Sequence, residues 1–414
     1  MSAVTAQDIK RVPSSPGTLT APEIKDIGRP HSLLVRAGKL YIGGTKGLAA
    51  LDEKGTVLWT TELPEADGRA VDVDGEHVAY SSFLIAGLDR GSGLTAALMW
   101  GSPSQKLVVE RAEVGVVASA DGKPVWQVKL AEATGLSPPA LGGKALAVQG
   151  AKNLLLYERA TGKPITEILT FTNWLGLSDA WNSRLPVMRP LWVDGGVITA
   201  HQSWMKKVNE QGEELVATKS LGKNFTMLTT GPLLCKDKVI LSEAAYPEGN
   251  IFSGKKARVY AASVKGEKVW YEETPDDVAG TSDLTCNEDT IFAVSNAMVT
   301  AFSYAGKEQW RYVSKGGVLI PGTHRGLLKA GTLPIAHQIT AGRQAVVAGP
   351  YLYVTSRAER TWKGKSDVIT VFDIAKGEIV EQIDPNTIIV DMAVFGSDLA
   401  LTTTEGLRFI ALKQ

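Results

Sequence analysis

One four-part pattern recurs along most of the chain: an apolar stretch, a tight turn, a second apolar stretch, and then a further hairpin of the same kind. Its clearest copy runs from Ser32 to Leu63 and reads SLLV-RAG-KLYIGG-TKG-LAALDE-KG-TVLWTTEL. Apolar and β-branched residues alternate within each stretch, and glycine marks the gaps, which is typical of short antiparallel strands. Such units bury their apolar faces by stacking on one another.

The first hairpin turn of this unit can be counted along the sequence. Asp-Gly and Gly-Gly pairs suit such turns because a tight hairpin needs positive φ angles. Eight copies occur, at Ala37-Gly38, Asp74-Gly75, Gly142-Gly143, Asp194-Gly195, Lys236-Asp237, Glu288-Asp289, Ala348-Gly349 and Gly396-Ser397. The count predicts an all-β fold, an eight-bladed β-propeller of four-stranded antiparallel blades.

The second hairpin carries a glycine followed four residues later by tryptophan. The pair occurs four times, as Gly55 and Trp59, Gly122 and Trp126, Gly266 and Trp270, and Gly306 and Trp310. Three further units keep the glycine but place Thr166, Val216 or Glu381 at the tryptophan position. We expect the glycine to turn the chain and the indole to pack flat on the neighbouring blade. The four tryptophans are therefore predicted to be structural.

This spacing, with Ala50-Leu51-Asp52 ahead of Gly55 and Trp59, resembles the PQQ-like repeat family of β-propellers. The resemblance extends over nearly the whole chain from about residue 31. It implies a closed, WD40-like ring of blades. The family includes quinoprotein dehydrogenases and also non-enzymatic BamB-like scaffolds of outer-membrane assembly, so the resemblance implies a fold and leaves the function open.

The last unit has only three strands before the chain stops, at residues 391–396, 398–403 and 407–412. An open final blade would leave unpaired backbone groups at its edge. We therefore expect a segment within Asp8 to Thr18 to supply the fourth strand of the last blade; the alternative is a three-stranded blade with a loose N-terminal arm. The predicted organisation is an N-terminal arm, residues 1–30, and a single propeller domain, residues 31–414.

The long connections all belong to one face of the predicted ring. In a four-stranded meander, the second-to-third loop and the link to the next blade lie at the same end. The long insertions are of this kind: residues 83–106, 244–257 and 357–367 within blades, and links 172–187 and 315–342. Part of the first insertion, residues 93–100, could form a helical turn. Function is expected on this loop-rich face.

Several residues on that face have the side chains that dominate protein interfaces, namely Trp, Met and Arg. The candidates for partner contact are Trp174, Trp181, Arg184, Met99, Trp100 and Trp204. Two interpretations stay open. These side chains fold back and plug the ring, as large apolar groups usually do, or they contact a partner.

Signals for catalysis are weak. The sequence contains no His-Glu-x-x-His zinc motif, nucleophile elbow, P-loop or dinucleotide fingerprint. The quinoprotein enzymes hold their cofactor beneath two cysteines that are adjacent in sequence and above a calcium ion. In this chain, Cys235 and Cys286 are far apart in sequence. The leading prediction is a non-enzymatic protein-binding scaffold without a cofactor. The alternative is an enzyme that uses PQQ with calcium, or another small molecule, in the central channel, and ligand or glycan sensing at the loop-rich face is a third possibility.

Charge and cysteine content limit which partners and which cellular compartment are possible. With 44 basic and 44 acidic residues the net charge is zero, which argues against nucleic acid as a partner. No apolar run reaches the length of a transmembrane helix. We therefore expect a protein that is cytoplasmic as written, or periplasmic if a signal peptide was removed. We also expect the protein to be monomeric on its own. Cys235 and Cys286 precede equivalent turns in successive units. We expect buried free thiols. A disulfide needs Cα atoms within about 7 Å, and we do not expect adjacent blades to bring these two residues that close.

Overall fold

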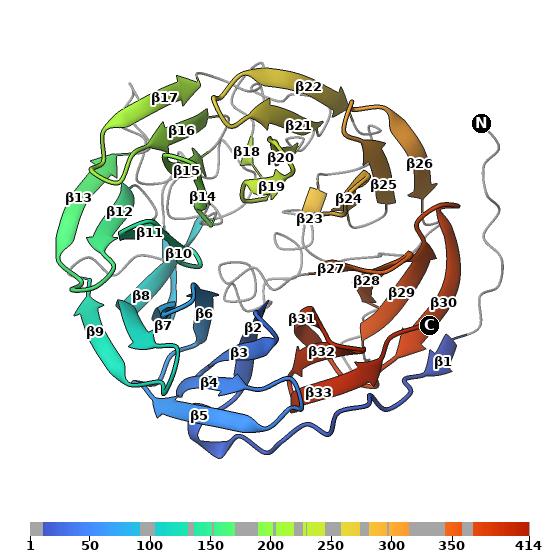
Figure 1. The fold of residues 1–414 in the computed structure, drawn as a ribbon, viewed down its shortest axis with the longest axis horizontal. Helices are drawn as coiled ribbons and strands as arrows, with labels where there is room; N and C mark the ends of the chain where they lie inside the picture. The colour runs from blue at the N-terminus through green and yellow to red at the C-terminus, as the bar shows by residue number, and fades with distance from the viewer. Residues whose placement is uncertain are drawn as a thin grey trace.

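A computed structural model of the chain has eight sheets arranged round a central axis, which confirms the predicted eight-bladed β-propeller (Figure 1). Each sheet runs from an inner strand near the axis to an outer strand at the rim, and consecutive strands are antiparallel. The structure describes residues 11–91, 104–130, 136–150, 153–169, 189–201, 204–218, 227–228, 230–244, 258–273, 281–295, 298–313, 344–357 and 367–413.

The first four blades follow one another from inner to outer strand. Blade one contains β2 (Pro30–Arg36), β3 (Lys39–Gly44), β4 (Gly47–Leu51) and β5 (Val57–Glu62). Blade two contains β6 (Gly68–Val73), β7 (His77–Gly91), β8 (Ser104–Ala118) and β9 (Pro124–Lys129). Blade three contains β10 (Ala140–Gly142), β11 (Ala145–Gln149), β12 (Asn153–Glu158) and β13 (Pro164–Leu169). Blade four contains β14 (Leu191–Val193), β15 (Gly196–His201), β16 (Trp204–Val208) and β17 (Glu214–Thr218).

The other four blades complete the ring. In blade five, β18 (Met227–Leu228) and β19 (Leu233–Cys235) share the inner position beside β20 (Lys238–Ala244), β21 (Arg258–Ser263) and β22 (Lys268–Glu273). Blade six contains β23 (Thr281–Cys286), β24 (Thr290–Ser295), β25 (Met298–Ser303) and β26 (Glu308–Val313). Blade seven contains β27 (Ala345–Ala348), β28 (Tyr351–Arg357), β29 (Asp367–Asp373) and β30 (Glu378–Asp384), and blade eight contains β31 (Ile389–Phe395), β32 (Asp398–Thr403) and β33 (Gly406–Ala411).

The core lies in the seams between adjacent blades. A middle strand such as β24 is covered on both faces, and all six of its residues are buried, which explains why such strands read as nearly continuous apolar runs. The outer strand β22 has no buried residue. At the seam of blades one and two, Tyr41 and Ala50 pack with Val71 and Tyr80. Each blade therefore depends on both of its neighbours for burial.

The repeated tryptophan connects each blade that carries it to the next blade. The Trp59 indole Nε1 donates a hydrogen bond of 3.0 Å to the carbonyl oxygen of Ser119, and the ring lies on Gly122. The same arrangement joins Trp126 to Arg159 O and Gly162, Trp270 to Tyr304 O and Gly306, and Trp310 to Ile374 O and Gly377. The glycine thus has two functions, since it adopts a positive φ in the turn and leaves room for the indole.

A β-bulge lies one residue before this position in the outer strand of blades one to seven. The extra residues include five apolar side chains that are 38–50% exposed: Leu58, Val125, Leu215, Val269 and Val380. A bulge disrupts the ladder and so discourages another strand from pairing at the edge. The bulges therefore account for the position of these exposed apolar residues in the outer strands.

The N-terminal arm closes the ring at blade eight, as predicted. Pro16 forms an antiparallel bridge with Ile410 of β33, and the Gly17 N–H donates to the Phe409 carbonyl at 3.1 Å. Residues 15–17 thereby occupy the fourth-strand position, within the predicted window of Asp8 to Thr18. The short strand β1 (Arg11–Pro13) then pairs in parallel with β30 of blade seven. In Figure 1 the arm follows the outer rim from β1 past β33 towards β5.

The prediction of free cysteine thiols is wrong. Cys235 ends β19 and Cys286 ends β23, and the two residues form a disulfide with a Cα–Cα distance of 6.2 Å. The physical reason is that the inner strands of adjacent blades converge on the axis, which brings equivalent residues within bonding distance. The disulfide therefore connects the inner strands of blades five and six.

The first prediction concerns the glycine beneath the indole. Gly122→Ala should lower the free energy of unfolding by about 1–2 kcal/mol for the positive φ of +72°, and by about 1–3 kcal/mol more for the clash with Trp59. Gly38→Ala is the matched control, because Gly38 has a φ of +74° and no atom within 4 Å of an added Cβ. Urea unfolding of both variants measures the difference. Equal losses would contradict the role given to the indole.

The second prediction concerns the disulfide. It closes a loop with a sequence separation of 51 residues, so its loss should lower the free energy of unfolding by about 4 kcal/mol. Thermal unfolding with and without a reductant measures the effect. The double variant Cys235→Ser, Cys286→Ser is the control and should not respond to the reductant. A wild-type midpoint that is insensitive to reduction would refute the prediction.

Candidate interaction face

Most of the residues predicted to contact a partner on the loop-rich face lie outside the described residues. This applies to Met99 and Trp100 in the blade-two insertion and to Trp174, Trp181 and Arg184 in the link between blades three and four. Trp204 begins β16 and pairs with His201 in the ladder, although its side chain lies outside the part of the structure that is described. The partner-contact role of these six residues stays a prediction.

The blade-two insertion forms strands over most of its length. Strands β7 and β8 stay paired as far as Gly91 and Ser104. The prediction of a loop over residues 83–106 is therefore wrong for residues 83–91 and 104–106. Residues 92–103 lie outside the described residues. Beyond Phe83, the last β7 residue that pairs with β6, eight residues of each strand continue. We call residues 84–91 and 104–111 the blade-two ribbon; at about 3.3 Å per residue it is roughly 25 Å long. β-Branched residues such as Ile85 and Val109 favour this conformation.

Polar contacts hold the root of the ribbon. The Asp67 carboxylate accepts a 2.6 Å hydrogen bond from the Ile85 N–H, and the Asp67 N–H donates to the Phe83 carbonyl at 3.0 Å. On the other strand, Arg111 donates to the carbonyl oxygen of Glu65. Asp67 and Glu65 belong to the link between blades one and two. The ribbon is therefore attached to that link as well as to its own blade.

A row of buried charged groups stiffens this end of blade two. Arg69 is fully buried, donates to the Gly44 and Pro64 carbonyls and lies over the Tyr80 ring, with Cζ 5.7 Å from the centroid. Burial lowers the pKa of its guanidinium to about 10, so the group remains charged at neutral pH. Arg69 therefore holds the second-to-third loop of blade one and the following link against blade two.

Glu113 is the buried anion in this row. Its side chain is 1% exposed, with Oε1 3.2 Å from the Arg111 Nε, and Oε2 accepts a hydrogen bond from Gln127. Neither Arg69 nor Glu113 is among the residues predicted from the sequence. A signal was present, because each is a charged residue whose neighbours on both sides in the strand are small or apolar, and a buried charge needs partners.

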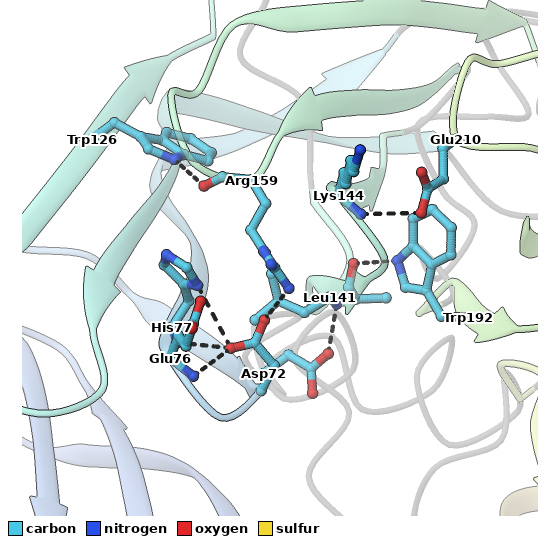
Figure 2. Close-up of polar contacts among 11 residues, drawn as sticks. Asp72, Glu76, His77, Trp126, Leu141, Lys144, Arg159, Trp192 and Glu210 are labelled. Carbon is cyan, nitrogen blue, oxygen red and sulfur yellow. Dashed lines mark hydrogen bonds and ion pairs between the residues drawn. The ribbon is translucent and has the colours of Figure 1, made fainter.

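On the opposite face, short turns connect blades two, three and four (Figure 2). The Asp72 carboxylate accepts a 2.7 Å hydrogen bond from the Leu141 N–H, and Glu210 accepts one from the Lys144 N–H at 3.0 Å. Trp192 donates its indole N–H to the Ala140 carbonyl at 2.7 Å. These contacts run between backbone groups and side chains of neighbouring blades, so they hold the ring together.

Asp74 belongs to the same group of contacts and closes the first hairpin turn of blade two. It accepts hydrogen bonds from the Glu76 and His77 N–H groups at 2.8 and 2.7 Å, and the Arg159 Nη1 lies 2.6 Å from its Oδ2. Partial burial opposes ionisation, but the two N–H groups and the guanidinium outweigh it, so the pKa of the Asp74 carboxyl is lowered. Within the described ranges, no three His, Cys, Asp or Glu side chains form a metal-binding group.

The third prediction follows from Asp74. Because its pKa is lowered on folding, its ionised form stabilises the protein above the unfolded-state value of about 3.9, and this contribution is lost as the pH falls through the folded-state pKa. The thermal midpoints of the wild type and Asp74→Asn should therefore differ most near pH 6 and converge in acid. Melting curves from pH 6 down to about pH 2.5 check this. A constant difference would show that Asp74 does not stabilise through its charge.

Comparison with known proteins supports the fold. No protein family and no curated protein matches this chain by sequence. Among solved structures, BamB from Moraxella catarrhalis is 13% identical, with 99% of this chain and 98% of that chain covered and a TM-score of 0.57. Saccharomyces cerevisiae Sqt1 is 8% identical, with 97% and 100% covered and a TM-score of 0.61.

The described residues contain no helix long and apolar enough to cross a membrane. At identities this low, similarity between structures establishes the fold alone. The chain has the β-propeller fold of BamB and Sqt1, and this confirms, as a likeness of fold, the resemblance to the PQQ-like repeat propellers.

Proposed function

We propose that the chain is a non-enzymatic scaffold that binds a protein partner through its loop-rich face, with the blade-two ribbon as the main contact element. The observation that carries the proposal is the ribbon itself. Its strands β7 and β8 are 15 residues long, whereas no other described strand exceeds seven. The contacts of Asp67 and Arg111 fix its root in advance, so little conformational entropy would be lost on binding.

The proposed anchors are Met99 and Trp100, which lie in sequence between the two strands of the ribbon, together with Trp174, Trp181, Arg184 and Trp204. Tryptophan, methionine and arginine side chains supply large contact areas at protein interfaces. The zero net charge of the chain favours a protein over a nucleic acid as the partner. The proposed role needs no cofactor. PQQ with calcium stays the alternative prediction.

We further propose that the protein works in an oxidising compartment such as the periplasm. The support is the disulfide between Cys235 and Cys286, because thiols in the cytosol are kept reduced and structural disulfides persist mainly outside it. Of the two compartments that the sequence left open, this observation favours the periplasm over the cytoplasm.

The fourth prediction tests the ribbon. Replacing residues 88–107 by Asn-Gly would join Gly87 and Val108, which pair in the ladder, through a favourable two-residue turn and would keep the root contacts. The shortened protein should keep its thermal midpoint and lose its partner in a cross-linked pull-down from the native host, quantified by mass spectrometry. The control is Lys54→Glu with Lys123→Glu on the short-turn face, which should keep the partner.

A second variant, Trp174→Ala with Trp181→Ala, tests the link between blades three and four separately. If the shortened protein recovers the same partner in the same amount as the wild type, the ribbon is not the contact element. If neither variant changes the recovered proteins, the loop-rich face is not the binding face.

A further inference from the structure

The edge of the ribbon on the β8 side has no strand beside it within the described part of the chain. Strand β9 ends at Lys129, which pairs with Glu113, and the last backbone bond along this edge runs from the Leu130 N–H to the Ala112 carbonyl. Within the described ranges, β8 from Arg111 to Ser104 pairs with β7 on its other side only.

The other described edges at the rim are interrupted by a bulge or covered by the N-terminal arm. A bulge interrupts the outer strand of each of the first seven blades, and the N-terminal arm covers β30 and β33. The ribbon has its own register shifts near its root, between Leu84 and Gly87. Beyond them the register is regular for five pairs, from Gly87 opposite Val108 to Gly91 opposite Ser104.

An open regular edge offers backbone N–H and C=O groups at alternate residues, and these groups are satisfied by another extended chain. A two-stranded ribbon alone is only marginally stable, so a third strand would also stabilise the ribbon. The chain itself shows that its sheets accept an added strand, since β1 joins blade seven as a fifth strand beside β30.

We infer that residues 104–108 of β8 bind an extended segment of the protein partner, which joins the ribbon as a third strand. This inference rests on the proposed function and specifies how the partner is recognised: mainly through its backbone, with few demands on its sequence. The β8 edge is favoured because it lies on the same side of the ribbon as the outer strand β9. The β7 edge lies on the side of the inner strand β6, and its root is already occupied by Asp67.

The fifth prediction tests this mode with a defined probe. A phage-displayed library of random peptides of about eight residues, a common strand length, is selected against the full chain and counter-selected against the variant that lacks residues 88–107. Selected peptides are then synthesised with single backbone N-methyl groups. Methylation at every second residue should weaken binding about tenfold per site, because it removes a hydrogen bond to β8. The residues between them should tolerate it.

The outcomes separate this inference from the proposed function. If peptides bind the ribbon but tolerate methylation at every position, the ribbon remains a binding arm and strand addition is wrong. If no peptide is enriched, or if selected peptides bind the shortened protein equally well, strand addition is also wrong. A wild-type dimer that the shortened protein does not form would assign the edge to a second copy of the chain and overturn the inference.

Discussion

Every blade of this ring needs a neighbour on each face, so the last blade must be sealed against the first. The N-terminal arm meets this requirement. The fully buried Asp398 of blade eight accepts hydrogen bonds from the Thr18 N–H, the Thr18 hydroxyl and the Leu19 N–H. Leu19 then lies on Gly55 of blade one, at the position where four other seams have a tryptophan on a turn glycine. The closing segment thus reproduces, with a different side chain, the contact that joins the blades elsewhere.

The variations on that contact follow the same logic. Blade three has Thr166 in place of tryptophan, and its side chain still covers the next turn glycine, Gly212. At this seam an indole comes from the opposite direction, because Trp192 of blade four reaches back over Gly142 of blade three. The position of the large aromatic group can therefore change as long as the space between two blades is filled.

Local sequence was sufficient to predict what local chemistry determines. The turns, the number of blades and the closing segment follow from glycine spacing and from the missing fourth strand. The disulfide was not predictable in this way, because the distance between Cys235 and Cys286 depends on how steeply two inner strands converge. The blade-two insertion was misread for a related reason. Its strands depend on cross-strand pairing, since eight of the 14 residue pairs between β7 and β8 lie at Phe83 or beyond. Arg69 and Glu113 show a signal that was present but unused, a charged residue between small or apolar neighbours in a strand.

The same constraint that makes the ring stable also limits where it can act. Indole contacts, the Asp72 and Asp398 hydrogen bonds and the disulfide fix most seams, so the blades themselves have little freedom to adapt to another molecule. The ribbon differs because, among the residues that the structure describes, its outer residues pair only with each other, while its root shares the rigidity of blades one and two through Asp67 and Arg111. A rigid base with an uncommitted strand edge is the combination that recognition through the backbone requires, since the edge is oriented but its hydrogen-bonding groups are still available.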